Sequence, residues 1–514
     1  MHRLFYVEEL VRQIAFDAYE RPLGSASLLA LACSCKILEG PVMDVLWQRQ
    51  KLLDIILRTL PADCWTLTDG VYRLIKIPTT KEWKRFKTYT GRVAELHVGD
   101  PPGCQEVSSA TISFLVAQST VDPLWPGLTS LRLYEPRWEM LVSALAFLSR
   151  KIKAFTLVLP QDTSILLHPI LSIASARCHE VQELVLDTVV EGPHSIDMVG
   201  GLISACKDTL RTLEIRSPFE TEYLPIIANL PRLKILRLEK AGSFSCDIPS
   251  DSFPVLEEFT FSGFQERRIE IFLKLLGTAG LKVAKMYSHV TIDFEKSIAA
   301  LSRFSASLED LEITAITSLD LVRVPAFRLP FTNLRNVRLR CLHREVALLG
   351  SCTLRLSDKA VVDLGAAMPN LTHLTLGNPI CPGLQCTTFL ALVGLSKTCR
   401  ELETLEIKID FRTMVAPSLS LSETKEVETP VETQGHGCKL RKLVVGASIL
   451  PAPSEESGWI VAAGLGKIFP SLTEVEGRGN FGRGKWGSVD RNLRMFRQVL
   501  RTVGIQGTHS RFDS

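Results

Sequence analysis

Leucine and other apolar residues recur along this chain in short segments of the form Leu-x-x-Leu-x-Leu, separated by more polar stretches. The intervals between the clearest segments are 23, 23, 25, 27 and 26 residues, and these segments begin at Leu210, Leu233, Leu256, Leu281, Leu308 and Leu334. Further segments begin near Val93, Leu128, Ile152, Val181, Leu371, Leu402, Leu440 and Leu472. Regular intervals of this size are typical of proteins in which each repeat is one supersecondary unit.

Apolar and charged residues alternate inside each segment, which predicts a β-strand with one face in the core and the other exposed. Several strands are preceded by an apolar residue, Pro, any residue and Leu, at 125–128, 230–233, 253–256, 368–371 and 469–472. Proline ends the preceding helix there and turns the chain into the strand. Between strands, residues 270–276 and 359–368 have helical character. Repeated helix-loop-strand units predict an α/β fold with a parallel sheet in a curved solenoid.

The N-terminal part has helical periodicity instead, and three short helices are expected there. The first carries an apolar stripe of Val7, Leu10, Val11 and Ile14. The second carries Leu28, Leu31, Ala32 and Cys35. Gly40-Pro41 is expected to end the second helix and begin a third, because proline suits the first helical turn. The stripe of that third helix is Val42, Val45, Leu46 and Leu53. So short a module buries its own surfaces poorly and needs a partner or a neighbouring domain.

Composition narrows the class of protein. The chain has 514 residues, of which 46% are apolar, and its formal net charge is +3 from 59 basic and 56 acidic residues. This balance argues against nucleic-acid or membrane-surface binding through bulk charge. The thirteen cysteines are dispersed, and the first residues lack the apolar core of a secretory signal. Reduced thiols in the cytoplasm or nucleus are therefore expected, with no membrane-spanning segment.

Ser34-Cys35-Lys36 and Leu38 stand near the end of the second predicted helix, and Pro41, Leu46 and Trp47 stand in the third. They match the end of the second helix of an F-box and the Pro-x-x-x-x-Leu-Trp that its third helix commonly carries, so the module resembles an F-box. The repeats resemble a leucine-rich-repeat solenoid. The first helix departs from the family, since Tyr6-Val7 replaces the usual Leu-Pro. The repeats are degenerate, because the asparagine that usually follows the strand is mostly missing. An N-terminal cap on the solenoid, with no partner, is the alternative interpretation of the module.

Residues 73–93 resemble the linker of a large group of fungal F-box proteins. Thr79 and Glu82 have the spacing of a helix capping box. Trp83 and Phe86 lie three residues apart on the helix that follows, and we expect them to be core residues that anchor it to the repeats.

Two further motifs, for a nucleotide-binding loop and a zinc site, match the sequence only in part. Gly477, Gly479 and Gly482 fit G-x-G-x-x-G, but no nucleotide-binding βαβ unit surrounds the segment. Gly479 to Lys485 also fit G-x-x-x-x-G-K, but Trp486 occupies the position of the magnesium-binding Ser or Thr. A flexible loop before a final capping helix at 491–503 explains 477–487 better. Cys381 and Cys386 lack the spacing and the second ligand pair of a zinc site. The polar segment 418–437 is expected to be a disordered insertion between repeats, and a regulatory or phosphorylated segment is the alternative.

The F-box resemblance implies a non-catalytic substrate receptor of an SCF-type ubiquitin ligase, without cofactor or metal. It would bind a Skp-type adaptor, and through it a cullin, while the repeats hold an unknown protein target. The resemblance implies eight adaptor-binding residues: Leu10, Ile14, Leu31, Cys35, Leu38, Pro41, Leu46 and Trp47. Some of them must pack the module's own core, and the sequence does not divide the two roles. A repeat scaffold without a ligase role is the main alternative, and a nucleotide-dependent enzyme using 477–487 is a third.

The domain boundaries expected from these features are an F-box-like module at 1–60, a linker with a capping helix at 61–92, a solenoid at 93–490, and a C-terminal helix and tail at 491–514.

Overall fold

In the computed structural model the chain forms two compact units, residues 1–239 and 240–514. The described residues are 7–20, 24–48, 52–99, 105–119, 124–134, 145–159, 164–188, 193–216, 223–239, 252–263, 272–276, 280–288, 294–315, 331–341, 356–377, 387–412, 437–445, 448–450, 455–477 and 483–502. The predicted insertion at 418–437, apart from Gly437, and both Cys381 and Cys386 lie outside these ranges.

Unit 1 begins with three packed helices, α1 (Glu8–Tyr19), α2 (Gly24–Ser34) and α3 (Lys36–Gln48). Their shared core consists of Val11, Ala15, Leu28, Ala32, Leu38, Val42 and Val45. At the α1–α2 connection, a Cβ on Gly24 would lie only 2.1 Å from the carbonyl oxygen of Tyr19. The backbones therefore approach so closely there that only glycine fits.

Gly40-Pro41 lies inside α3, so the prediction that this pair separates the second and third helices is wrong. The break comes earlier, at Cys35, which lies between α2 and α3. Proline removes one backbone hydrogen bond from the helix interior. Burial of Leu38 and Val42 on either side of Pro41 outweighs that loss and keeps the helix continuous.

A small linker region follows, with α4 (Leu53–Leu57), β1 (Trp65–Thr68), β2 (Val71–Leu74) and α5 (Thr80–Thr90). Strands β1 and β2 form an antiparallel hairpin whose turn residues, Asp69 and Gly70, have φ of 53° and 76°. Such positive values are typical of the two-residue turns that join hairpin strands. Strand β4 (Glu106–Val107) pairs in parallel with β2.

The predicted capping box at the start of α5 is confirmed: the backbone N–H of Thr79 donates to Glu82 Oε2 at 2.6 Å, and Thr79 Oγ1 accepts from the Glu82 N–H. The anchoring aromatics are also in place. Phe86 is fully buried against Trp125 of the repeats, while Trp83 is only half-buried and lies against Phe114.

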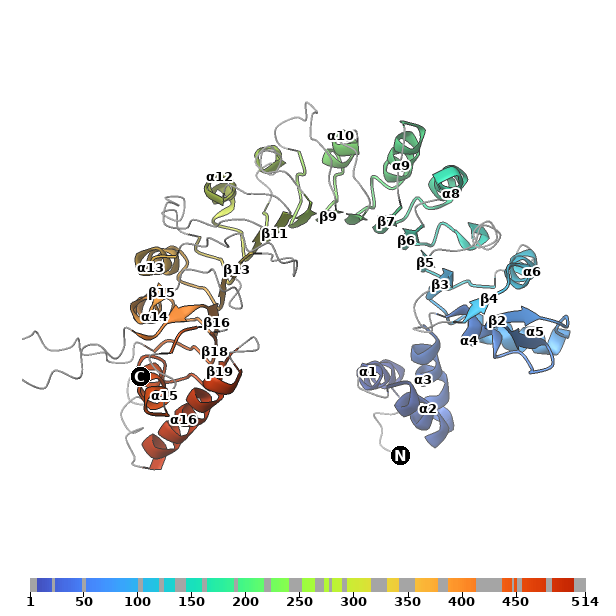
Figure 1. Ribbon diagram of the computed structural model, residues 1–514. Helices are drawn as coiled ribbons and strands as arrows, with labels where there is room; N and C mark the ends of the chain where they lie inside the picture. Colours follow the sequence, from blue (N-terminus) through green and yellow to red (C-terminus); the bar gives the residue numbers. More distant parts are fainter. Residues whose placement is uncertain are drawn as a thin grey trace, which may run out of the picture. The chain divides into compact units, whose positions relative to one another are not determined.

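The rest of unit 1 is a parallel sheet in chain order, with its helices on one side of the strands (Figure 1). The strands are β3 (Glu95–Gly99), β5 (Ser130–Tyr134), β6 (Ala154–Val158), β7 (Glu183–Asp187), β8 (Thr212–Ile215) and β9 (Ile235–Glu239). The helices are α6 (Ser109–Ser119), the 3₁₀ turn η2 (Leu145–Phe147), α8 (Ser164–Arg177), α9 (Pro193–Ala205) and α10 (Leu224–Ala228).

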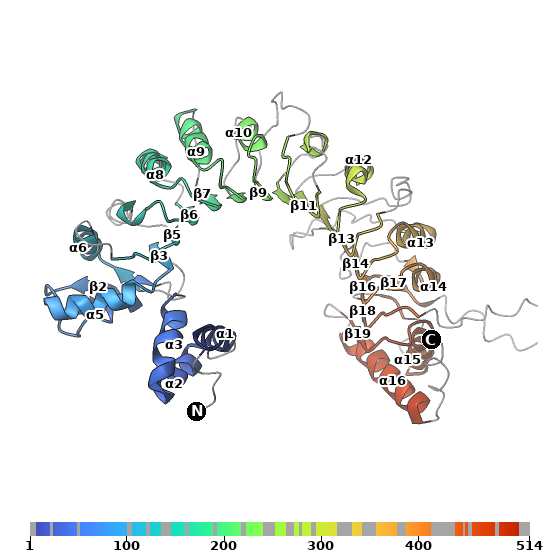
Figure 2. The ribbon, with the colours of Figure 1, turned by 180° about the vertical axis from the view of Figure 1, so that it is seen from behind.

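Unit 2 repeats this arrangement, again with parallel strands in chain order and helices on one side (Figure 2). Its strands are β10 (Glu258–Ser262), β11 (Val283–Ser288), β12 (Asp310–Ala315), β13 (Asn336–Cys341), β14 (His373–Leu376), β16 (Thr404–Ile407), β18 (Lys442–Val444) and β19 (Glu474–Glu476). Its helical segments are α12 (Phe294–Leu301), η5 (Ser302–Phe304), α13 (Asp358–Ala367), α14 (Phe389–Thr398), α15 (Glu455–Ile468) and α16 (Arg483–Thr502). Strands β15 (Thr387–Thr388) and β17 (Ile409–Asp410) form a separate parallel pair.

The leucine spacing predicts the strands correctly. Every predicted opening residue, from Val93 to Leu472, is buried and lies two residues before a strand. Residues within the strands alternate as expected: in β9, Leu236 and Leu238 are fully buried between more exposed neighbours. The preceding proline sits in a tight turn. The N–H of Leu128 donates to the carbonyl of Trp125, and Leu472 donates likewise to Phe469. Proline is favoured at the second position of such a turn.

The glycine-rich segment differs from the prediction. Helix α16 starts at Arg483, so residues 483–487 are helical rather than part of a loop, and the final helix begins before residue 491. Trp486 explains the early start, because its side chain is buried against Phe411 with ring centroids 5.2 Å apart. Leu493 is buried on the same helix, which packs on α15 and β19 at the end of the sheet. Within the described residues, no helix combines the length and apolarity required to cross a bilayer.

Candidate functional site

The helical module leaves large apolar side chains exposed on all three helices. Leu10 and Ile14 of α1 are 42% and 46% exposed, Leu29 of α2 is 49% exposed, and Ile37 of α3 is 43% exposed. Val7 is also exposed and shares with Leu10 and Ile14 the spacing of one helix face. Val7, Leu10 and Ile14 therefore form an exposed aliphatic stripe on α1, which makes this helix face a candidate interaction surface.

The eight residues that the F-box resemblance implies for adaptor binding divide into three groups. Leu10 and Ile14 are exposed. Leu31, Cys35 and Pro41 are half-buried. Leu38, Leu46 and Trp47 are buried. The buried group therefore supports the module's fold, and the first two groups can contact a partner directly.

Trp47 joins the module to the linker. Its ring lies 4.7 Å from the ring of Tyr89 on α5, measured between centroids. Beyond it, the N–H of Ala94 donates to the carbonyl of Gln48 at 3.4 Å, and Leu52 forms a bridge with His97 in the first strand of the sheet. The end of α3 is thus tied to the edge of the unit 1 sheet.

Asp44 is an ionic junction between the module and the linker. One carboxylate oxygen accepts from Arg12 of α1 at 2.9 Å, and the other accepts from Arg92, just after α5, at 2.9 Å. Arg12 also pairs with Glu8 at 2.7 Å. These contacts connect α1, α3 and the end of α5, and the exposed side chains of α1 are consequently held in a defined position relative to the repeats.

The polar face of each sheet is the second candidate surface. In unit 1, Arg132 pairs with Glu95 at 2.9 Å, and Glu214 accepts from Arg216 at 2.6 Å. In unit 2, Lys442 contacts Glu474 at 2.7 Å and Glu476 at 3.0 Å. Alternating charges of this kind suit recognition of a polar protein surface.

Strands β11 and β12 carry two groups with raised pKa values, Tyr287 and Asp310. Burial raises the pKa of Asp310, and its Oδ1 has no hydrogen-bond partner among the described residues. Burial, followed by the neighbouring Glu312, raises the pKa of Tyr287 to about 12. Arg338 lies 3.5 Å from Glu312. Both raised pKa values oppose ionisation, so Tyr287 stays a neutral phenol at neutral pH.

The buried cysteines are poor nucleophiles. Burial raises the pKa of Cys178 to about 12, and those of Cys206 and Cys399 to about 11. The thiolate is the reactive form of cysteine. Cys178, Cys206 and Cys399 therefore remain protonated at neutral pH and act as packing residues, and each of them is a free thiol.

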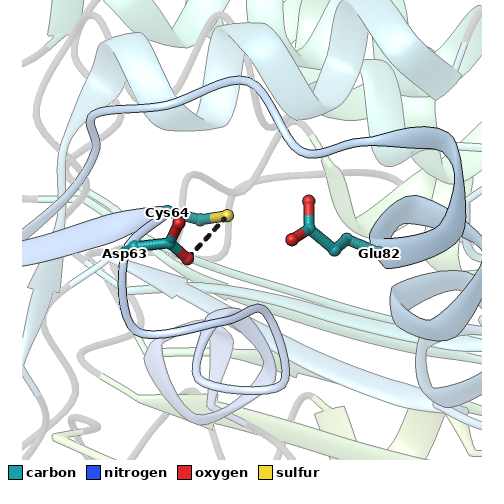
Figure 3. A group of neighbouring side chains, drawn as sticks. All are labelled: Asp63, Cys64 and Glu82. Carbon is teal, nitrogen blue, oxygen red and sulfur yellow. Dashed lines mark hydrogen bonds between the residues drawn. The ribbon is translucent and has the colours of Figure 1, made fainter.

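Asp63, Cys64 and Glu82 form one group of potential metal ligands within the described residues, with donor atoms within 4.8 Å of one another. The carboxylate of Glu82 faces the thiol of Cys64, and Asp63 lies beside that thiol (Figure 3). Each acid already has a partner: Asp63 binds Lys76 at 2.6 Å, and Glu82 accepts from Thr79 in the capping box. These hydrogen bonds lower the pKa of both carboxyl groups, and burial raises the pKa of Cys64. Both carboxylates therefore make contacts within the linker, Asp63 with Lys76 and Glu82 with Thr79.

Comparison with known proteins adds little to this geometry. No protein-family model matches the chain, and no curated protein matches it. One similar solved structure is a crystal structure of the Rad7 and Elc1 complex in yeast, with 18% sequence identity and a TM-score of 0.32. The match covers 57% of this chain and 80% of the solved one.

Proposed function

We propose that this protein is a non-catalytic substrate receptor of an SCF-type ubiquitin ligase. The helical module binds a Skp-type adaptor, and a sheet built of degenerate leucine-rich repeats holds a target protein. The observation that carries the proposal is the exposed apolar surface of the module around Leu10 and Ile14. It lies on the module whose sequence resembles an F-box.

The ionic and aromatic ties of the module support this role. A receptor must present its target to a ubiquitin-loaded enzyme at a fixed distance, and tethering then raises the local concentration of the target. Asp44 and Trp47 fasten the module to the linker and so limit its movement relative to the unit 1 repeats. No chemistry is required of the chain itself. Its free thiols suit the reducing cytoplasm or nucleus.

Co-expression with a Skp-type adaptor, followed by size-exclusion chromatography, tests the proposal. We expect a one-to-one complex with the native chain and its loss in the double variant Leu10→Glu/Ile14→Glu. Burying a leucine or isoleucine side chain contributes about 1.5–3 kcal/mol, so placing charge at both positions should weaken binding at least ~100-fold.

Ile75→Glu/Ile77→Glu is the matched control, because these linker residues are 63% and 74% exposed and receive the same change in charge. Its complex should persist, and both variants should keep the native melting temperature. A complex that survives in the Leu10/Ile14 variant would contradict the proposed surface.

A repeat scaffold without a ligase role is the second candidate, favoured by the charged polar faces of the two sheets. Such a scaffold needs no adaptor. A well-folded native chain that forms no complex with any Skp-type adaptor would select it.

A further inference from the structure

Helix α5 has two different faces. Phe86 and Thr90 are buried, and Trp83 stacks on Phe86 with ring centroids 5.1 Å apart. Lys81, Lys84, Arg85 and Thr88 recur at i, i+3, i+4 and i+7, and they are all exposed. That spacing places them together on one side of the helix, away from the buried aromatic residue.

This basic side lines a pocket of about 410 Å³ between α5 and α3. Its lining residues are Glu39, Met43, Lys81, Lys84, Arg85, Thr88, Tyr89 and Arg92. Four of them are cations, and Glu39 is the one acid among them. Tyr89 is held by its contact with Trp47, so one wall of the pocket is rigid.

The cations of the pocket are mostly uncompensated. Arg92 pairs with Asp44, but Lys81, Lys84 and Arg85 form no ion pair with any residue that the structure describes. Like charges three and four residues apart destabilise a helix. Arg132 and Lys282 have acidic partners, whereas Arg150 and Lys153 have none among the described residues. A helix that keeps three neighbouring cations unpaired beside a pocket is suited to an anionic ligand.

We propose that this pocket, defined by Lys81, Lys84, Arg85 and Thr88, binds the phosphate group of a phosphorylated peptide. The planar guanidinium of Arg85 suits bidentate binding of phosphate, and the lysines add charge. Thr88 lines the same pocket, where its hydroxyl donates to the carbonyl of Lys84 at 3.1 Å. The pocket volume exceeds what a phosphate needs, which leaves Met43 and Tyr89 to contact the residues beside the phosphorylated one. This site goes beyond the proposed function and does not depend on adaptor binding.

Fluorescence anisotropy with the full-length chain tests the site. The probe is a fluorescein-labelled ten-residue peptide of alanine and glycine with one central phosphothreonine, beside the same peptide with threonine. We expect saturable binding of the phosphopeptide alone. The variant Lys84→Gln/Arg85→Gln should weaken it about 100-fold, taking about tenfold for each lost charge-assisted contact.

Arg150→Gln/Lys153→Gln is the matched control, since it removes the same charge from exposed residues before β6 and should leave binding unchanged. Glu39→Gln should tighten binding, because it removes the one acid of the pocket.

Competition by inorganic phosphate separates the two sources of the group. If it displaces the phosphopeptide only at far higher concentration, the peptide is the ligand. If it competes at equal concentration, the pocket binds free phosphate, and the peptide part of the proposal is overturned. Equal binding of the unphosphorylated peptide, no binding at all, or equal weakening in the control variant would overturn the site.

Discussion

The helical module and the repeats are both predicted from apolar stripes, of helical period in the module and of strand period in the repeats, and the two stripes have opposite fates. In the repeats, every predicted opening residue from Val93 to Leu472 is buried, because each strand has neighbours and covering helices. In the module, Val11 is buried while Leu10 and Ile14, on the same predicted stripe, are exposed. The apolar stripe of each repeat is buried in the protein's own core. On the short terminal module, part of the stripe stays exposed.

The largest effect is expected at Trp47, which belongs to the module but is buried like a repeat residue. Trp47→Ala should cost about 3–5 kcal/mol of stability, because it removes the contact with Tyr89 and leaves a cavity. The midpoint of urea unfolding, followed by far-ultraviolet circular dichroism, measures this loss. An unchanged midpoint would mean that Trp47 is not a core residue and would return it to the adaptor surface.

The same substitution in the two regions tests the comparison directly. Leu213→Ala, at a fully buried position of β8, should lower stability by about 2–5 kcal/mol. Leu10→Ala, at an exposed position of α1, should change stability by no more than about 0.5 kcal/mol and should weaken adaptor binding instead. Urea unfolding and adaptor affinity, measured on both variants, give the four values needed. Similar losses of stability would show that Leu10 is a core residue.

The sequence predicts some elements of the fold and not others. The strands are predictable because leucine spacing and the turn with proline act within a few residues, as Trp125 to Leu128 shows. The β1–β2 hairpin was not predicted, although Asp69-Gly70 is a strong local signal for such a turn. The helix boundary predicted at Gly40-Pro41 is wrong, because the burial of Leu38 and Val42 overrides a local helix breaker.

The candidate site was less predictable for a different reason. Periodicity places Leu10 and Ile14 on a helix face but does not tell whether that face meets the same chain or a partner. The contacts of Asp44 with Arg12 and Arg92 join residues far apart in sequence, and no local pattern signals them. The basic pocket likewise needs α3 and α5 side by side, although the spacing of Lys81, Lys84 and Arg85 was readable.

The capping box of α5, in the linker between the module and the repeats, gives the next test. Thr79→Ala removes the side-chain oxygen that accepts from the Glu82 N–H, and it should cost about 1 kcal/mol. The loss should appear as faster hydrogen exchange in the first turn of α5. Thr88→Ala, on the exposed side of the same helix, is the control and should leave exchange there unchanged. Equal effects of the two changes would contradict a specific role for the cap.

A small effect on stability, but an informative one, is expected at Asp44. Asp44→Asn weakens both ion pairs, and because Arg12 and Asp44 are partly exposed the cost should stay below about 1 kcal/mol. Hydrogen exchange should nevertheless increase in α1 while the strands β5 to β9 stay protected, since the junction holds the module and not the sheet. High salt should produce the same change in the native chain by screening the pairs. Asp17→Asn, which alters an exposed carboxylate of α1 whose one hydrogen-bond partner among the described residues is Gln13, is the matched control. If exchange in α1 increases equally in both variants, Asp44 is an ordinary surface residue, and the position of Leu10 and Ile14 must depend on the apolar packing of α1 against α2 and α3.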